Sequence, residues 1–165
     1  MGTINYGSNN YVVIGCNPDS WDDDRDEFDS YEEWDDRKNF EMQDDYDRTK
    51  EILNDYSFNN FKVTLELGYY EGFYIDIKTY FNWCLDSYKD RKEINSEVSQ
   101  IKELLIRLVN EVGLCSVWPG WCVTYRTREE TFKDINEGIK KLRVEVKKIP
   151  TYRQWAKLPD ELKWC

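Results

Sequence analysis

Apolar and polar residues alternate along the middle of the chain. Apolar side chains occupy every second position in two runs, Phe61, Val63, Leu65 and Leu67, then Phe73, Ile75 and Ile77. Successive side chains of a strand point to opposite faces, so these runs predict two half-buried strands. Glycines within residues 68–72 predict a hairpin between them, and the β-branched run at residues 11–15 predicts a further buried strand.

Two other stretches carry an apolar residue every three or four positions, which is the spacing of an amphipathic helix. The first covers residues 92–112 and is followed by Gly113, a residue typical of helix ends. The second begins after Thr127, which forms a capping-box pattern with Glu130, and it ends before Pro150.

The N-terminal third predicts further helices. Helical spacing of apolar residues predicts one over residues 40–56, and Ser20 is the expected N-cap of an earlier one. A strand pair is expected around residues 118–121. The predicted fold class is α+β in a single domain, residues 1–165. A small, mostly antiparallel sheet packs against two long amphipathic helices, with an acidic helical segment at residues 19–56.

Charge is distributed unevenly along the chain. Residues 1–56 contain 17 acidic and 5 basic side chains, a balance of −12. Residues 57–165 contain 16 acidic and 18 basic side chains, a balance of +2, which gives the net charge of −10. Within residues 19–36, eleven carboxylates accompany a single basic residue, Arg25. Such concentrated negative charge repels nucleic acid and attracts the basic surfaces that bind it.

The composition excludes several classes of function. The chain has no histidine, which removes the commonest general base and metal ligand and every Ser-His or Cys-His dyad. Its five cysteines include no C-x-x-C pair, so neither a disulfide framework nor a zinc ribbon is indicated. No apolar run approaches the roughly 18 residues that span a bilayer, and the N-terminus does not resemble a signal peptide. We therefore expect a cytoplasmic protein that is not an enzyme and uses no cofactor.

The acidic run is the predicted partner-binding site. Its carboxylates are interleaved with aromatic residues at roughly helical spacing, and aromatic residues often anchor interfaces. The predicted contact residues are Asp22, Asp23, Asp24, Asp26, Glu27, Asp29, Glu32, Glu33, Trp34, Asp35 and Asp36. The alternative is that this run is only a solvated helix face or a disordered tail, which is what charge runs usually are.

Two further patterns suggest metal binding. Carboxylates at the first, third, fifth and twelfth positions of residues 22–33 match an EF-hand calcium loop, but Glu27 and Asp29 stand where that loop needs glycine and an apolar residue.

Cys115 and Cys122 are expected to lie close across a Pro-Gly turn, although buried, unpaired cysteines are much commoner than metal or redox pairs.

A third pattern suggests nucleic-acid cleavage. Asp76 and Lys78 lie two positions apart on a predicted strand, with Glu66 upstream, and this set is similar to the acidic and lysine residues of metal-dependent nucleases. There carboxylates hold magnesium while the lysine assists the attacking water. Solvent-facing strand residues explain the same pattern, and an acidic protein attracts a polyanionic substrate poorly.

Short motifs throughout the chain resemble a family of small acidic proteins encoded by phages and prophages of gut bacteria. The motifs are NYGS at residues 5–8, GYYEGFY at 68–74, PGWC at 119–122 and PTYRQW at 150–155. The resemblance implies inhibition of host defence, as by anti-CRISPR and anti-restriction proteins that act as DNA mimics, and it supplies no catalytic residues. Because the negative charge is confined to one third of the chain, a localised acidic epitope is expected rather than mimicry by the whole surface.

The leading hypothesis is a phage-encoded inhibitor that binds a basic, nucleic-acid-binding surface of a bacterial defence nuclease, such as a CRISPR effector, inside the host cell. Residues 22–36 are the expected contact. A metal-dependent nuclease or other phage enzyme using Glu66, Asp76 and Lys78 is the first alternative, and a structural or regulatory phage protein is the second.

Overall fold

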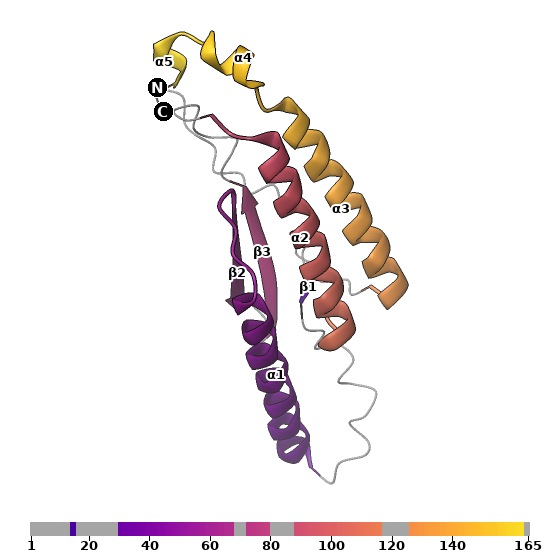
Figure 1. Ribbon diagram of the computed structural model, residues 1–165. Coiled ribbons are helices and arrows are strands. Elements are labelled where there is room, and N and C mark those ends of the chain that lie inside the picture. Colours follow the sequence, from indigo (N-terminus) through magenta and orange to yellow (C-terminus); the bar gives the residue numbers. More distant parts are fainter. Residues whose placement is uncertain (1–13, 16–29, 68–71, 80–87, 117–125, 164–165) are drawn as a thin grey trace.

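The computed structural model describes residues 14–15, 30–67, 72–79, 88–116 and 126–163. The elements in chain order are β1 (Ile14–Gly15), α1 (Tyr31–Asn54), β2 (Phe61–Leu67), β3 (Phe73–Thr79), α2 (Arg91–Glu111), β4 (Cys115–Ser116), α3 (Arg128–Lys148), α4 (Tyr152–Ala156) and α5 (Asp160–Lys163). Long helices lie alongside a small sheet, so the fold class is α+β, as the sequence predicts (Figure 1). None of the described helices is both long and apolar enough to cross a membrane.

The described strands form a four-stranded antiparallel sheet in the order β2-β3-β1-β4. β2 and β3 pair along their whole length, from Phe61 opposite Thr79 to Leu67 opposite Phe73. Both strands predicted from the alternating pattern are therefore confirmed, as is a strand within the β-branched run near the N-terminus. The strand pair expected around residues 118–121 lies outside the described residues.

β1 approaches β3 so closely that only glycine fits at one position. A Cβ atom on Gly15 would lie 2.2 Å from the carbonyl oxygen of Phe73, well inside van der Waals contact. The neighbouring residue Ile14 is fully buried between Ile75 of β3 and Ser116 of β4. The sequence Ile-Gly thus combines an apolar anchor with the close approach of two backbones.

Helices cover the apolar face of the sheet. From α1, the ring of Tyr46 meets the ring of Phe73 edge to face at 5.5 Å. From α3, Thr131 Oγ1 accepts a hydrogen bond from the backbone N–H of Ser116 at 2.9 Å. α2 supplies the largest buried set, namely Ile94, Val98, Ile101, Leu104, Leu105, Leu108 and Val109. This confirms the apolar stripe that the sequence predicts for the main core helix.

The helix ends follow their local sequence signals. Asp90 caps α2 by accepting a hydrogen bond from Lys92 N at 2.9 Å, and Gly113 follows the helix with a φ of +81°. Thr127 and Glu130 form both hydrogen bonds of the predicted capping box at the start of α3. The residue before Pro150 is extended, as prolines require, and ends α3.

The predicted boundary of the first long helix was wrong. We expected a helix over residues 40–56, whereas α1 spans Tyr31–Asn54. Ser30 caps it by accepting a hydrogen bond from Glu33 N at 3.2 Å, and acidic residues in a first turn interact favourably with the helix dipole. These local terms favour a helix that begins before the apolar spacing on which the prediction rested. The earlier helix expected from Ser20 lies outside the described residues.

A buried carboxylate fastens the start of β2 to α2. Glu97 is only 6% exposed, and its two oxygens accept the backbone N–H groups of Asn59 and Asn60 at 2.8 and 3.0 Å. One turn earlier, the exposed Glu93 accepts the side-chain amide of Asn59 at 3.2 Å. Because α2 carries most of the core, this clamp sets where the hairpin begins relative to the helices.

Candidate functional site

The structure describes only part of the predicted partner-binding site. The predicted contacts Asp22, Asp23, Asp24, Asp26, Glu27 and Asp29 lie outside the described residues, as does most of the suggested calcium loop. Glu32, Glu33, Trp34, Asp35 and Asp36 fall in the first turns of α1. Of these, Glu32, Glu33 and Asp36 are exposed, so three predicted contacts lie on an ordered helix and face solvent.

An acidic stripe continues from these residues along the outward face of α1. Thr49 and Ile52 mark the face of this helix that packs on the core. On the opposite face, exposed residues recur every three or four positions, as one face of a helix requires: Glu33, Asp36, Phe40, Asp44, Asp47 and Glu51. We call these six residues the acidic ridge. At a rise of 1.5 Å per residue the ridge is about 27 Å long.

Phe40 stands in the middle of the acidic ridge. Its side chain is 74% exposed, the most exposed of the large apolar side chains in the described ranges. A lone exposed apolar residue is common on protein surfaces, but here carboxylates precede and follow it on the same helix face. The ridge therefore combines an apolar contact point with surrounding negative charge.

The carboxylates of the ridge are poorly neutralised. Within the part of the chain that the structure describes, Glu33, Asp36, Asp44 and Glu51 form no salt bridge. Asp47 accepts a hydrogen bond from the uncharged Gln43 amide at 3.1 Å. Like charges three or four residues apart destabilise a helix by about 0.2–0.5 kcal/mol per pair, so the ridge is not explained by the stability of α1.

The same crowding acts on a carboxyl group beside the ridge. Partial burial, and then the nearby charges of Asp44 and Glu41, raise the pKa of Asp45, while Arg48 opposes them. On the flank, Arg37 and Glu41 form an exposed ion pair at 3.1 Å. Arg37 is therefore paired with a carboxylate that is not part of the ridge.

The nuclease-like residues share the polar face of the hairpin. Asp76 is 7% exposed, and its Oδ2 lies 2.9 Å from Nζ of the half-exposed Lys78. This contact raises the pKa of Lys78, and Asp76 Oδ1 is buried without a hydrogen-bond partner among the described residues. Glu66 instead accepts the hydroxyl of Thr64 at 2.8 Å. Over the described ranges, no group of three or more acidic or cysteine side chains is arranged to hold a metal ion.

One of the two cysteines predicted to lie close together is described. Cys115 is half-buried, with Sγ 3.9 Å from the carbonyl oxygen of Gly15, and burial raises the pKa of its thiol. A raised pKa lowers the thiolate fraction and with it the reactivity of the group. Its suggested partner Cys122 lies outside the described residues.

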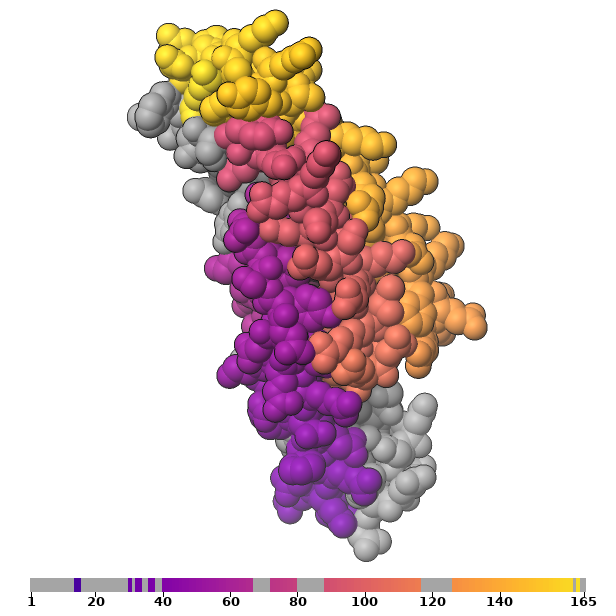
Figure 2. All heavy atoms as spheres, in the orientation of Figure 1, coloured from indigo at the N-terminus to yellow at the C-terminus, as the bar shows by residue number. Residues whose placement is uncertain are grey.

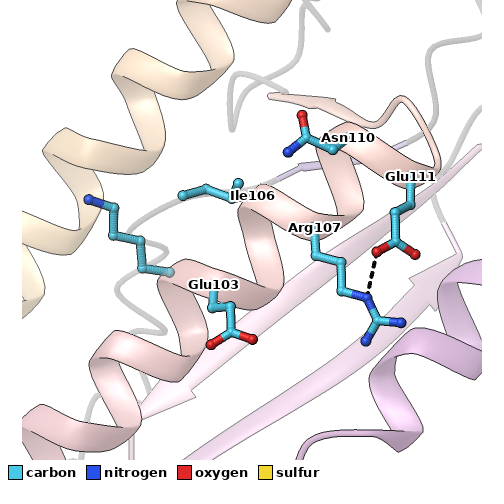
Figure 3. A pocket seen from close by; sticks show the side chains of 6 residues that line it. Glu103, Ile106, Arg107, Asn110 and Glu111 are labelled. Carbon is cyan, nitrogen blue, oxygen red and sulfur yellow. Dashed lines mark hydrogen bonds and ion pairs between the residues drawn. The ribbon is translucent and has the colours of Figure 1, made fainter.

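A shallow pocket of about 510 Å³ opens on the surface of α2 (Figure 3). Its lining residues are Lys102, Glu103, Ile106, Arg107, Asn110 and Glu111. Arg107 is held by ion pairs to Glu111 and to Asp55, both at 2.7 Å, and these contacts raise its pKa. Because Arg107 is already paired with two carboxylates, the pocket is a weaker candidate for binding a charged partner than the acidic ridge.

The ridge residues after Asp36 were missed in the sequence. The prediction placed the helix start at Phe40 and treated the residues before it as a separate segment. The regular spacing of Glu33, Asp36, Phe40 and Asp44 is apparent only when one helix runs through all of them. Comparison with family models, with curated proteins and with solved structures gave no match to this chain.

Proposed function

We propose that this protein is a non-catalytic inhibitor whose acidic ridge occupies the basic, nucleic-acid-binding surface of a bacterial defence nuclease, such as a CRISPR effector. The supporting observation is the ridge itself. It presents exposed carboxylates that lack salt bridges within the described residues, arranged on one helix face around an exposed phenyl ring.

The chemistry of the ridge suits such a target. A line of fixed carboxylates competes with phosphate groups for the lysine and arginine residues of a nucleic-acid channel. Phe40 adds an apolar anchor that phosphates lack, and buried aromatic anchors contribute disproportionately to affinity. Charge is therefore expected to set the association rate, and Phe40 the dissociation rate.

The test compares two triple variants with the same change in net charge. The ridge variant carries Asp36→Asn, Asp44→Asn and Glu51→Gln. The control variant carries Glu129→Gln, Glu137→Gln and Glu161→Gln, which are also exposed. Each tagged protein is used to capture partners from lysates of cells that contain defence nucleases, and bound proteins are identified by mass spectrometry. Loss of the partner with the ridge variant alone supports the proposal, and equal capture by both variants contradicts it.

Salt and competing nucleic acid provide the second readout. Exposed charges are screened over about 10 Å at 0.1 M salt and about 3 Å at 1 M, so binding is expected to weaken steeply over that range. Guide or substrate nucleic acid is expected to compete for the same surface. A partner that binds equally well at both salt concentrations, and is indifferent to nucleic acid, would show that the ridge is only a solubilising surface.

A metal-dependent nuclease is the second candidate, on one observation. The buried Oδ1 of Asp76 has no hydrogen-bond partner in the part of the chain that the structure describes, and an unsatisfied buried oxygen is unfavourable unless another group bonds to it. Magnesium is commonly held by one or two carboxylates together with substrate phosphates, and Glu66 lies on the neighbouring strand. Oδ2 is already engaged by Lys78, so this candidate ranks below the ridge.

A further inference from the structure

A row of lysines lies along the outward face of α3. Leu142 marks the buried face of this helix, and the opposite face carries Lys133, Glu137, Lys140, Val144 and Lys147, so one carboxylate interrupts the lysines. All five are exposed, Val144 at 47%. None of the three lysines forms a salt bridge with any other described residue. We call the three lysines and Val144 the lysine row.

The lysine row and the acidic ridge have opposite charge and a similar layout. α1 contains nine acidic and four basic residues, a balance of −5, whereas α3 contains seven basic and five acidic residues, a balance of +2. Each face has an exposed apolar residue among its charges, Phe40 on the ridge and Val144 on the row. These are two of the four large apolar side chains exposed in the described part of the chain, the others being Tyr88 and Tyr152.

The two faces belong to different edges of the molecule. α2 packs against both α1 and α3; in Figure 1, α3 runs beside α2, and α1 lies below and to the left of α2. In the space-filling view, α1 forms the lower left of the visible surface and α3 its right edge (Figure 2). Because the residues of both faces are exposed, neither face covers the other within one chain. A contact between them requires two molecules.

We propose that the acidic ridge of one copy of this chain docks on the lysine row of a second copy. The inference rests on the proposed role of the ridge as a binder of basic surfaces, and it names one such surface. Carboxylates of the ridge pair with lysines of the row, and Phe40 packs against Val144. The interface is heterologous, so each added copy leaves one ridge and one row unpaired at the ends of the assembly.

A second copy fits the lysine row better than a nucleic acid does. Val144 lies between Lys140 and Lys147, where a phosphate backbone offers no apolar partner. The net charge of −10 repels a polyanion and a second copy alike over long range, so the choice between them depends on the apolar contact and on the local charge of the facing helices. The ridge supplies both required features, negative charge and an exposed apolar side chain, on another helix of the same chain.

The test is sedimentation of the full chain as concentration rises, at low and at high salt. A ridge-blocked variant carries Phe40→Ser and Asp44→Lys, and a row-blocked variant carries Lys140→Glu and Val144→Ser. Tyr152→Ser with Lys157→Glu is the matched control, because it also removes an exposed apolar residue and reverses one charge. All changes are at exposed positions, and circular dichroism is used to confirm that each variant folds.

Wild type and control are expected to associate at low salt and to separate at high salt. Each blocked variant alone is expected to lose association by at least about tenfold. An equimolar mixture of the two blocked variants retains one intact ridge and one intact row, so it is expected to form a one-to-one dimer that does not grow. A wild-type monomer at millimolar concentration, or a mixture that stays monomeric, overturns the inference. So does association that survives in either blocked variant alone.

Capture of the target separates this inference from the proposed function. The row-blocked variant is expected to keep the captured nuclease, while the ridge-blocked variant loses it. If wild type is monomeric and only the ridge-blocked variant loses the target, the inference fails and the proposed function stands. If the variants behave as expected in sedimentation but all capture the same proteins, the proposed function fails and self-association stands. Binding of inorganic polyphosphate through the lysine row of a monomeric wild type would identify a polyanion site and overturn the inference.

Discussion

Replacing Glu97 with glutamine is expected to unfasten β2 from α2. The two oxygens of this buried carboxylate accept the N–H groups of Asn59 and Asn60 at 2.8 and 3.0 Å. Glutamine keeps one acceptor and turns the other into an amino group that faces a backbone donor. A hydrogen bond to a charged group contributes about 1.5–3 kcal/mol, so Glu97→Gln is expected to lower the free energy of unfolding by about 2–3 kcal/mol.

Urea denaturation followed by circular dichroism measures this loss. In thermal denaturation the expected fall in Tm is about 4–12 °C, since 1 kcal/mol corresponds to about 2–4 °C in a chain of this size. Glu93→Gln is the matched control, because Glu93 lies one turn earlier, is exposed and bonds only the side chain of Asn59. Its effect is expected to stay within about 0.5 kcal/mol. If Glu97→Gln is no more destabilising than this control, the clamp does not hold the hairpin in place.

Three other changes test separate parts of the structure. Gly15→Ala places a Cβ against the Phe73 carbonyl and is expected to lower the urea midpoint more than Gly113→Ala, whose only cost is about 1–2 kcal/mol for a positive φ. A larger effect of Gly113→Ala would contradict the close approach of β1 to β3. The raised pKa of Asp45 means that the folded state binds its proton more tightly, so this group makes stability fall as pH rises above about 4. Asp45→Asn is therefore expected to raise the urea midpoint at neutral pH and to have little effect at pH 3, and a uniform effect at both would disprove that origin. With magnesium or manganese, the protein is expected to leave DNA and RNA intact on gels, whereas cleavage that Asp76→Ala abolishes would make the nuclease the leading function.

The parts of the fold that depend on neighbouring residues could be predicted from the sequence. Alternation over residues 61–77 identified both strands of the hairpin, because a strand exposes and buries side chains in turn. The capping box of Thr127 and Glu130, the glycine after α2 and the proline after α3 each act within one helical turn. Such local signals carry the same physical meaning wherever the rest of the chain lies.

Features that join distant segments, or that set one local effect against another, could not be predicted. Glu97 looks like an ordinary surface carboxylate until the start of β2 is placed beside it. The predicted start of α1 was wrong because it followed the spacing of apolar residues and did not consider the favourable cap at Ser30. The acidic ridge was missed as a consequence, because its spacing continues across the boundary that was expected at Phe40. The short helix α4 was also missed, because its capping box of Thr151 and Gln154 is followed by only one turn.

The place of β1 in the sheet constrains the order in which the protein can fold during synthesis. This strand is synthesised before every other described element, yet it lies between β3 and β4, and Ile14 pairs with Ile75 on one side and Ser116 on the other. The helix α2 must therefore have left the ribosome before the fourth strand is available. Contacts between residues so far apart in sequence slow folding, because a long loop has to close before they form. The hairpin of β2 and β3 is the natural first structure, and the N-terminal strand joins it late. A nascent chain stopped before Ser116 therefore has one edge of β1 unpaired. Such an exposed strand edge can bind chaperones or pair wrongly with another chain.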